Sequence, residues 1–202
     1  DGQSRGWADR MADVLALQSP EFTCAKFAVR GKWIRQVAAE QVPVALTYVT
    51  GPQTLFSFHA GANDVLRPKY KPEVALPLYT ESVRKIAKSG ATLVLFTVLE
   101  RTDRKGKTAD LWAARFGEFN KNVRAVAEEV GAFVADANEG GLLSDRRFLA
   151  DDRLHLNEIG HDRVAQGILE KLGLPFVTGW RAPLPAAATL SKPFTVPSSG
   201  SW

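Results

Sequence analysis

The sequence is poor in the residues that build disulfides and metal centres. It has a single cysteine, Cys24, and only three histidines. One cysteine cannot close a disulfide within the chain, and no group of His, Cys, Asp and Glu has the spacing of metal ligands. Cys24 lies in a β-favouring run, where a free cysteine is usually a small buried hydrophobe. We therefore expect no metal, no other cofactor and no cysteine-based chemistry.

The sequence also lacks long apolar runs. No stretch of about 18 or more apolar residues occurs, so no integral membrane segment is expected. The chain opens with Asp1-Gly-Gln-Ser4, whereas a signal peptide needs a basic segment followed by an apolar one. A cytoplasmic location is the default expectation. It holds only if Asp1 follows the natural start directly, because an incomplete N-terminus would leave export open.

No strong excess of one charge is present either. Against 26 basic residues stand 22 acidic ones, and the basic residues are scattered along the chain. A nucleic-acid partner is therefore not expected. The 202 residues, 45% of them hydrophobic, suffice for one domain with a sizeable core. We place this domain at residues 1–180 and a Pro- and Ser-rich tail, an extended arm or linker, at 181–202. The sequence leaves the oligomeric state open.

Helical and strand-like patterns alternate along the chain. This alternation predicts an α/β domain with a largely parallel sheet. We expect strands at 22–29, 54–58, 91–98 and 132–136. We expect helices over 7–15, 33–45, 116–130 and 158–172, and a short helix around Val83 and Ile86. Asn157 is the expected N-cap of the last helix. Residues 65–77, rich in Lys and Pro, are expected to form a loop that serves as a lid or substrate wall.

A carboxylate and an imidazole stand three residues apart just before the last helix, in Asp152-Arg-Leu-His155. At this spacing the Asp152 carboxylate can accept a hydrogen bond from one ring nitrogen of His155 and fix its tautomer. The other nitrogen is then free to act as a general base. Alternatively, both residues are merely polar groups on a loop.

A second motif, Phe58-His-Ala-Gly-Ala-Asn-Asp64, follows the strand expected at 54–58. In open α/β sheets, ligands bind at such strand ends. Gly61 would let the backbone approach a ligand, and the Asn63 amide could donate to a developing oxyanion. Gly31 follows the strand expected at 22–29, and its N–H could be a second donor. Taken alone, each glycine is also explained as an ordinary turn residue.

Three other polar residues near these motifs have structural interpretations. His59 is expected in packing or in a loop. Asp64 is expected to order its own turn through backbone hydrogen bonds. His161 would point to a different side of the last helix from His155 and is expected to be structural.

Gly31, Gly61-Ala-Asn63 and Asp152-Arg-Leu-His155, in this order, resemble three sequence blocks of the SGNH hydrolases, also called the GDSL lipase/esterase family. The resemblance implies a three-layer α/β/α fold with a flavodoxin-like parallel sheet. It also implies that Gly31 and Asn63 are oxyanion donors, that His155 is the base and that Asp152 orients it. The family's substrates are lipids, acylated sugars and small acyl esters.

The sequence departs from the family at the nucleophile, because it contains no Gly-Asp-Ser. We identify no nucleophile among its serines, which are Ser4, Ser19, Ser57, Ser82, Ser89, Ser144, Ser191, Ser198, Ser199 and Ser201. Ser4 comes closest to the expected place, but a helix N-cap or a loop serine is the simpler explanation. The sheet appropriate to the family would also lack its first strand. Residues 194–196 could fill that gap only in part, since Pro193 and Pro197 remove hydrogen-bond donors. The simplest interpretation is that an N-terminal piece is missing.

The resemblance therefore predicts an ester hydrolase that works by Ser-His-Asp acyl transfer, with the serine absent from these residues. The alternative is a non-catalytic binding module, or an inactive fragment, that holds an ester or glycan without cleaving it. The absent nucleophile favours the module. The presence of Gly31, Asn63, Asp152 and His155 together favours the enzyme.

Overall fold

The structure is a computed structural model that describes residues 5–100, 106–152 and 155–186. Ser4 and residues 194–196, considered above for the nucleophile and for the missing strand, lie outside these ranges. The described elements are α1 (Trp7–Gln18), α2 (Ile34–Gln36), η1 (Val37–Gln41), α3 (Val42–Leu46), β1 (Leu55–Phe58), α4 (Ala62–Val65), α5 (Pro72–Ala87), β2 (Thr92–Phe96), α6 (Lys107–Val130), β3 (Phe133–Ala135), η2 (Glu139–Gly141), η3 (Arg146–Phe148) and α7 (Glu158–Lys171).

The centre of the fold is a 3-stranded parallel sheet in the order β1-β2-β3. β2 is the middle strand, and its Leu93, Val94, Leu95 and Phe96 side chains are all buried. A strand covered on both faces needs such a continuous apolar run. The predicted parallel α/β sheet is confirmed, as are the strands expected near 54–58, 91–98 and 132–136.

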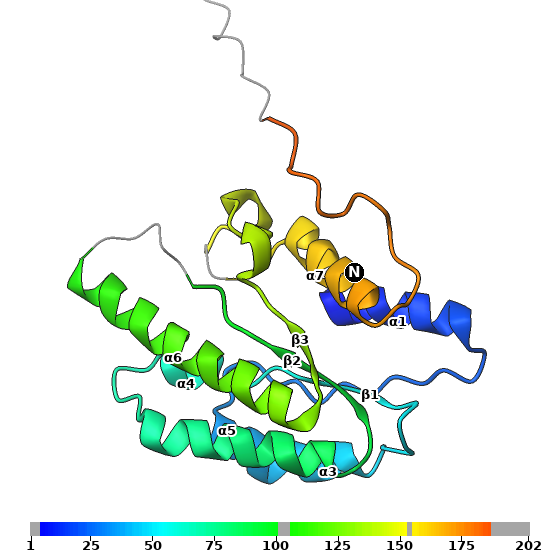
Figure 1. Cartoon of the computed structure of the whole chain (residues 1–202), viewed down its shortest axis with the longest axis horizontal. Helices are drawn as coiled ribbons and strands as arrows, with labels where there is room; N and C mark the ends of the chain where they lie inside the picture. The colour runs from blue at the N-terminus through cyan, green and yellow to red at the C-terminus, as the bar shows by residue number, and fades with distance from the viewer. Residues whose placement is uncertain (1–4, 101–105, 153–154, 187–202) are drawn as a thin grey trace, which may run out of the picture.

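Helices cover both faces of this sheet (Figure 1). On one face, α1 and α7 pack around a core that includes Met11, Phe96 and Ile168. On the other face, α5 and α6 pack against each other and against the sheet, and their core includes Tyr79 and Phe119. The result is the predicted three-layer α/β/α architecture.

The longest helix, α6, confirms the predicted apolar stripe. Phe116, Phe119, Val123 and Val126 recur at helical spacing and are all buried. Gly131 ends the helix with a left-handed φ of 71°. The helix therefore presents one apolar face to β2 and β3, as the sequence predicted.

The prediction of one loop over residues 65–77 is wrong. A short turn follows α4, and then α5 begins at Pro72, five residues before the expected loop ends. Proline suits the first helical position, because a backbone N–H at that position would have no hydrogen-bond acceptor within the helix. The early turns of α5 also bury Ala75 and Tyr79, and this burial stabilises the helix beyond the part that Val83 and Ile86 had indicated.

The strand expected at residues 22–29 does not form within the described chain. This segment has no regular secondary structure, and Cys24 is exposed rather than buried. A strand is stable only when a neighbour satisfies its backbone groups, and the described sheet ends at β1. Because this segment has no strand partner, its β-favouring residues form no regular secondary structure, and most of their side chains are exposed to solvent.

The helix expected over 33–45 is present as the unbroken succession of α2, η1 and α3. Its middle part, η1, has the wide π-helical turn. Pro43 lies just after it and lacks the N–H that an α-helix would bond to the carbonyl of Ala39. The π turn accommodates this missing bond without ending the helix.

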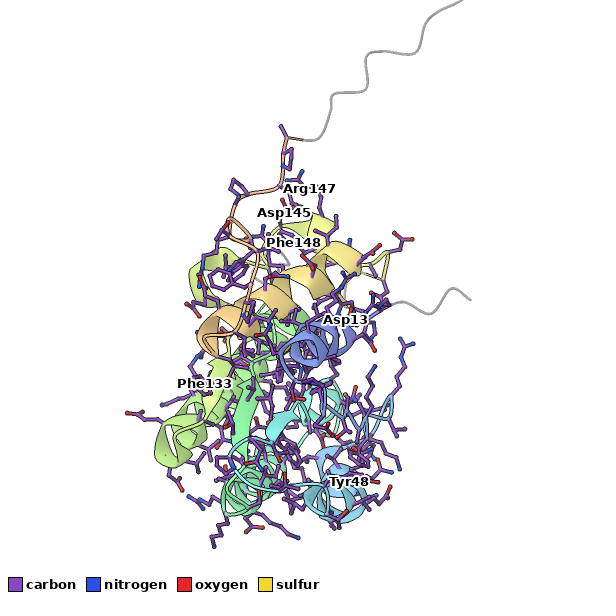
Figure 2. All side chains as sticks on the ribbon, turned by 90° about the vertical axis from the view of Figure 1, so that its right-hand side faces the viewer. Asp13, Tyr48, Phe133, Asp145, Arg147 and Phe148 are labelled. Carbon is purple, nitrogen blue, oxygen red and sulfur yellow. The ribbon has the colours of Figure 1, made fainter. Side chains whose placement is uncertain are left out.

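The last described residues lie against the body of the protein. The Arg147 guanidinium donates to the carbonyls of Leu184, at 3.3 Å, and of Pro185, and Arg163 donates to the carbonyl of Ala182. Figure 2 shows Arg147 and its partner Asp145 at the end of the molecule from which this segment leaves. None of the described helices has the length and apolarity that crossing a membrane requires.

Candidate active site

The predicted pair of Asp152 and His155 is formed. The His155 Nδ1 atom lies 2.5 Å from Asp152 Oδ2, and the His155 backbone N–H donates to Asp152 Oδ1 at 2.9 Å. One carboxylate thus fixes both the backbone and the ring of the histidine. The two side chains are 47% and 52% exposed, so the contact itself adds little stability. It leaves Nε2 as the nitrogen available for proton transfer.

Asn157 anchors the loop that carries this pair. Its Oδ1 atom accepts from the Gly160 N–H at 3.0 Å, which confirms the predicted N-cap of α7. Its Nδ2 atom donates to the carbonyls of Arg147, at 2.8 Å, and of Leu149, at 3.2 Å. The Ala150 N–H donates to the His155 carbonyl at 2.8 Å. His155 is therefore placed by a loop that is hydrogen bonded to the start of a long helix.

Gly31 and Asn63 are brought together at a second location. The Asn63 Nδ2 atom donates to the carbonyl of Lys32, the residue after Gly31, at 3.0 Å. Gly31 and Gly61 have left-handed φ values of 80° and 89°, which favour glycine. At Gly61 a side chain is also excluded by space, because a Cβ atom there would lie 2.7 Å from the Phe119 ring. The structure thus places the turn that contains Gly31 beside Asn63, the other predicted oxyanion donor.

Asp64 strengthens this junction in a way that the sequence did not indicate. Its Oδ2 atom accepts from the backbone N–H of Ile34 at 2.8 Å, so it bonds a distant segment in addition to its own turn. Partial burial raises the pKa of the carboxyl, while the hydrogen bond from Ile34 opposes this shift. Asn63 and Asp64 together hold the segment that begins with Gly31 against α4.

A series of contacts runs from the first turn of α7 to the segment that precedes Gly61. His161, one turn into α7, accepts at Nδ1 from the Trp7 N–H at 3.3 Å. The Trp7 ring lies 4.7 Å from Phe96, and Phe96 stacks on His59 at 5.0 Å between centroids. His59 directly precedes the turn that contains Gly61. The packing role of His59 and the structural role of His161 agree with what the sequence indicated.

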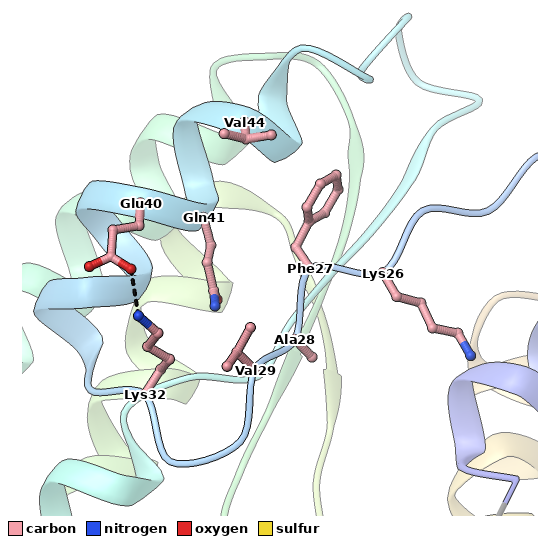
Figure 3. A pocket seen from close by; sticks show the side chains of 8 residues that line it. All are labelled: Lys26, Phe27, Ala28, Val29, Lys32, Glu40, Gln41 and Val44. Carbon is pink, nitrogen blue, oxygen red and sulfur yellow. Dashed lines mark hydrogen bonds and ion pairs between the residues drawn. The ribbon is translucent and has the colours of Figure 1, made fainter. Parts of the chain in front are cut away.

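A cavity of about 370 Å³ lies beside the oxyanion turn (Figure 3). The segment before Gly31 forms one wall, with Phe27 and Val29, and Gln41 and Val44 form the other. Lys32 closes the near end, where it pairs with Glu40 at 2.6 Å. Lys32, whose carbonyl binds Asn63, thus also lines this open groove.

None of the serines in the described ranges is hydrogen bonded to His155. The hydroxyls of Ser82, Ser89 and Ser144 donate to carbonyls in their own local turns. No group of three or more His, Cys, Asp or Glu residues in the same ranges could hold a metal ion. Within the described residues, the candidate site thus consists of a histidine supported by a carboxylate and two candidate oxyanion donors.

Comparisons with known proteins agree with the fold. The sequence profile of the GDSL-like lipase/acylhydrolase family matches residues 1–163, while no curated protein matches the chain. Among solved structures, the chain is similar to the acetylxylan esterase Axe2 from Geobacillus stearothermophilus, with 18% identity, a TM-score of 0.69, and coverage of 87% of this chain and 84% of that chain.

Two further structures are similar. The α/β hydrolase LAE5 from the metagenome of Lake Arreo is 21% identical, with a TM-score of 0.68 over 83% of this chain and 81% of that one. A protein from Parabacteroides merdae assigned to the GDSL-like lipases is 18% identical, with a TM-score of 0.71 over 85% and 83%. At these identities the likeness establishes a shared fold.

Proposed function

The chain belongs to the GDSL-like lipase/acylhydrolase family and is by that relationship an esterase, and we propose that the Asp152–His155 pair is the general base of its reaction. The 2.5 Å contact between Nδ1 and Oδ2 is the observation that carries this proposal. It holds the ring with Nε2 available, and the carboxylate stabilises the imidazolium that forms when Nε2 takes a proton.

Gly31 and Asn63 stabilise the tetrahedral oxyanion in this scheme. An amide group carries two N–H donors. Asn63 uses one of them on the Lys32 carbonyl, so the other is available for the substrate oxygen. The Gly31 N–H supplies the second donor. Donors held in place before reaction stabilise the developing charge without having to reorganise.

The scheme also requires a serine nucleophile, and none of the described serines is hydrogen bonded to His155. The sequence has no Gly-Asp-Ser, and a Ser-His-Asp reaction needs a serine whose hydroxyl proton passes to His155 Nε2 as its oxygen attacks the ester carbonyl. His155 then returns the proton to the leaving alkoxide. Water repeats the two steps on the acyl-enzyme and releases the acid.

Esters of small acyl groups are the proposed substrates, with acylated sugars first among them. The support is the likeness to acetylxylan esterases, together with an open groove beside the Gly31 turn. Lipid esters are the alternative substrates, because the family is one of lipases and acylhydrolases.

Hydrolysis of p-nitrophenyl acetate and butyrate tests this function. The chain is compared with an extended protein, in which a β-strand and a Gly-Asp-Ser segment precede Asp1, and with His155→Ala in both backgrounds. We expect turnover only in the extended protein and its loss in His155→Ala. Turnover by the present chain that depends on His155 would instead indicate an activated water or another nucleophile.

A binding module without catalysis is the second candidate, and the missing Gly-Asp-Ser favours it. In that case the extended protein hydrolyses no ester, while the chain binds acetylated xylo-oligosaccharides in calorimetry. Hydrolysis by the extended protein that His155→Ala abolishes would exclude this candidate.

A further inference from the structure

Two arginines flank an exposed tryptophan beside the Asn63 turn. The Trp33 side chain is 38% exposed, although it adjoins the buried Ile34. The Arg35 guanidinium carbon lies 5.4 Å from the centroid of the Trp33 ring, and that of Arg67 lies 5.5 Å from it. Both distances fall within the range of cation–π attraction. The Trp33 ring thus contacts two cations, Arg35 from its own segment and Arg67 from a segment far away in the sequence.

This Trp33 cluster, defined as Trp33, Arg35 and Arg67, is fixed to the oxyanion turn at both ends. Trp33 follows Lys32, whose carbonyl binds the Asn63 side chain. Arg67 lies one helical turn beyond Asn63, and its backbone N–H donates to the Asp64 carbonyl at 3.0 Å. A substrate held by Asn63 would therefore lie beside the two guanidinium groups.

A third arginine holds the backbone of Arg67 in place. The Arg115 Nη1 atom, on α6, donates to the Arg67 carbonyl at 2.9 Å. Arg115 also lies 5.5 Å from the centroid of the Tyr70 ring. The position of Arg67 is therefore set by the helical layer and by the turn together.

The guanidinium groups of Arg35 and Arg67 have unused hydrogen-bonding capacity. Within the residues that the structure describes, neither group forms an ion pair or donates a hydrogen bond. Asp64 is the acid on which both arginines act, and they lower its pKa against the larger effect of burial. One partly buried carboxylate, already bonded to Ile34, does not neutralise two exposed cations.

Forked N–H donors of this kind match the oxygens of a carboxylate or a phosphate. We propose that the Trp33 cluster binds an anionic group of the substrate, so that the preferred ester carries a carboxylate or phosphate near its reacting bond. The inference rests on the proposed esterase function, because it uses Asn63 as the point at which the ester is held.

Binding is measured without turnover, so that an inactive chain does not hide the result. The probes are N-butylsuccinamate, an amide with one carboxylate; butyl phosphate; and N-butyl-4-methylpentanamide, in which an isopropyl group replaces the carboxylate. Each is titrated into the chain and followed by ligand-observed NMR. The variants are Arg35→Gln/Arg67→Gln and, as a control of equal charge change, Lys85→Gln/Lys88→Gln at the exposed C-terminal end of α5.

We expect N-butylsuccinamate to bind about tenfold more tightly than the neutral amide, as charge-assisted hydrogen bonds would give. Arg35→Gln/Arg67→Gln should abolish this difference, and the control variant should keep it. Tighter binding of butyl phosphate than of N-butylsuccinamate would identify the anion as a phosphate. Equal binding of charged and neutral amides, or a preference that survives Arg35→Gln/Arg67→Gln, would overturn the proposal. Failure of the extended protein to hydrolyse esters would affect only the proposed function.

Discussion

The Asn63 side chain donates to the backbone carbonyl of Lys32 at 3.0 Å, across 31 residues of sequence. Through this bond, two segments that each end in a flexible glycine turn become one rigid unit. The second N–H of the amide then has a fixed direction, which is what an oxyanion donor requires. The bond has a structural and a chemical role at once, and the two can be separated by measuring stability and activity on the same variants.

Asn63→Ala removes the donor and the bond to Lys32. In the extended protein we expect kcat to fall by about 10²- to 10³-fold, as for other oxyanion donors, with a loss of about 1 kcal/mol in the free energy of unfolding. Asn122→Ala is the control, because Asn122 bonds only Thr80 between α5 and α6. If both variants lower kcat equally, Asn63 is a structural residue.

Asp152→Asn keeps the shape of the side chain but removes the charge that supports His155. We expect kcat of the extended protein to fall by about 10²- to 10⁴-fold. The neighbouring Asp151→Asn should leave it nearly unchanged. The ¹⁵N shifts of the His155 ring provide a reading independent of turnover, since Asp152→Asn should reduce the Nδ1–H tautomer. An unchanged tautomer would show that Asp152 does not orient the ring.

Gly61→Ala tests the close packing under the oxyanion turn. A Cβ atom at Gly61 would lie 2.7 Å from Phe119, while one at Gly90 would have no heavy atom within 4 Å. Both glycines have left-handed φ values, 89° and 81°, so the backbone strain of alanine is shared. We expect Gly61→Ala to cost about 1–3 kcal/mol more than Gly90→Ala in urea unfolding, which is the cost of overpacking. Equal losses would mean that Phe119 moves aside freely.

His161 should make the stability of the α1–α7 contact depend on pH. Burial lowers the pKa of His161, and Arg10 and His155 lower it further. The neutral ring is also the form that accepts from the Trp7 N–H at Nδ1. Because the folded-state pKa lies below the unfolded value of 6.5, the unfolded state binds the proton more readily. Stability is therefore fully present above pH about 6.5 and declines as the pH falls through the folded pKa.

Urea unfolding between pH 5 and 8 measures this effect. His161→Gln keeps an acceptor and cannot titrate, so we expect a shallower loss of stability toward acid than in the unchanged chain. Asp162 and Glu158, which pair with Arg10 at 3.6 and 3.3 Å, face the same contact, and Asp162→Asn tests their share. An identical pH dependence in His161→Gln would show that His161 does not contribute.

Much of the fold follows from local patterns. Apolar spacing predicted α1, α6 and α7, and the continuous apolar run predicted β2, because helices and buried strands repeat their contacts at short, regular intervals. Asn157 and Gly131 marked helix ends by the chemistry of their own side chains and backbone. The failures were at residues 22–29 and 65–77, where the outcome depended on partners: the first segment had no neighbouring strand, and the second gained helix by burying Tyr79.

The sequence by itself indicated that Asp152 and His155 can pair, since only one turn of chain lies between them. It also indicated turns at Gly31 and Gly61, because glycine favours turns. Tertiary structure alone decided that Asn63 reaches Lys32, that Asp64 reaches Ile34, and that Arg35 and Arg67 meet on Trp33. The bonds of Asn63 and Asp64 span 31 and 30 residues of sequence, and the packing of α4 against the segment after Gly31 closes that distance and brings Arg67 to Trp33.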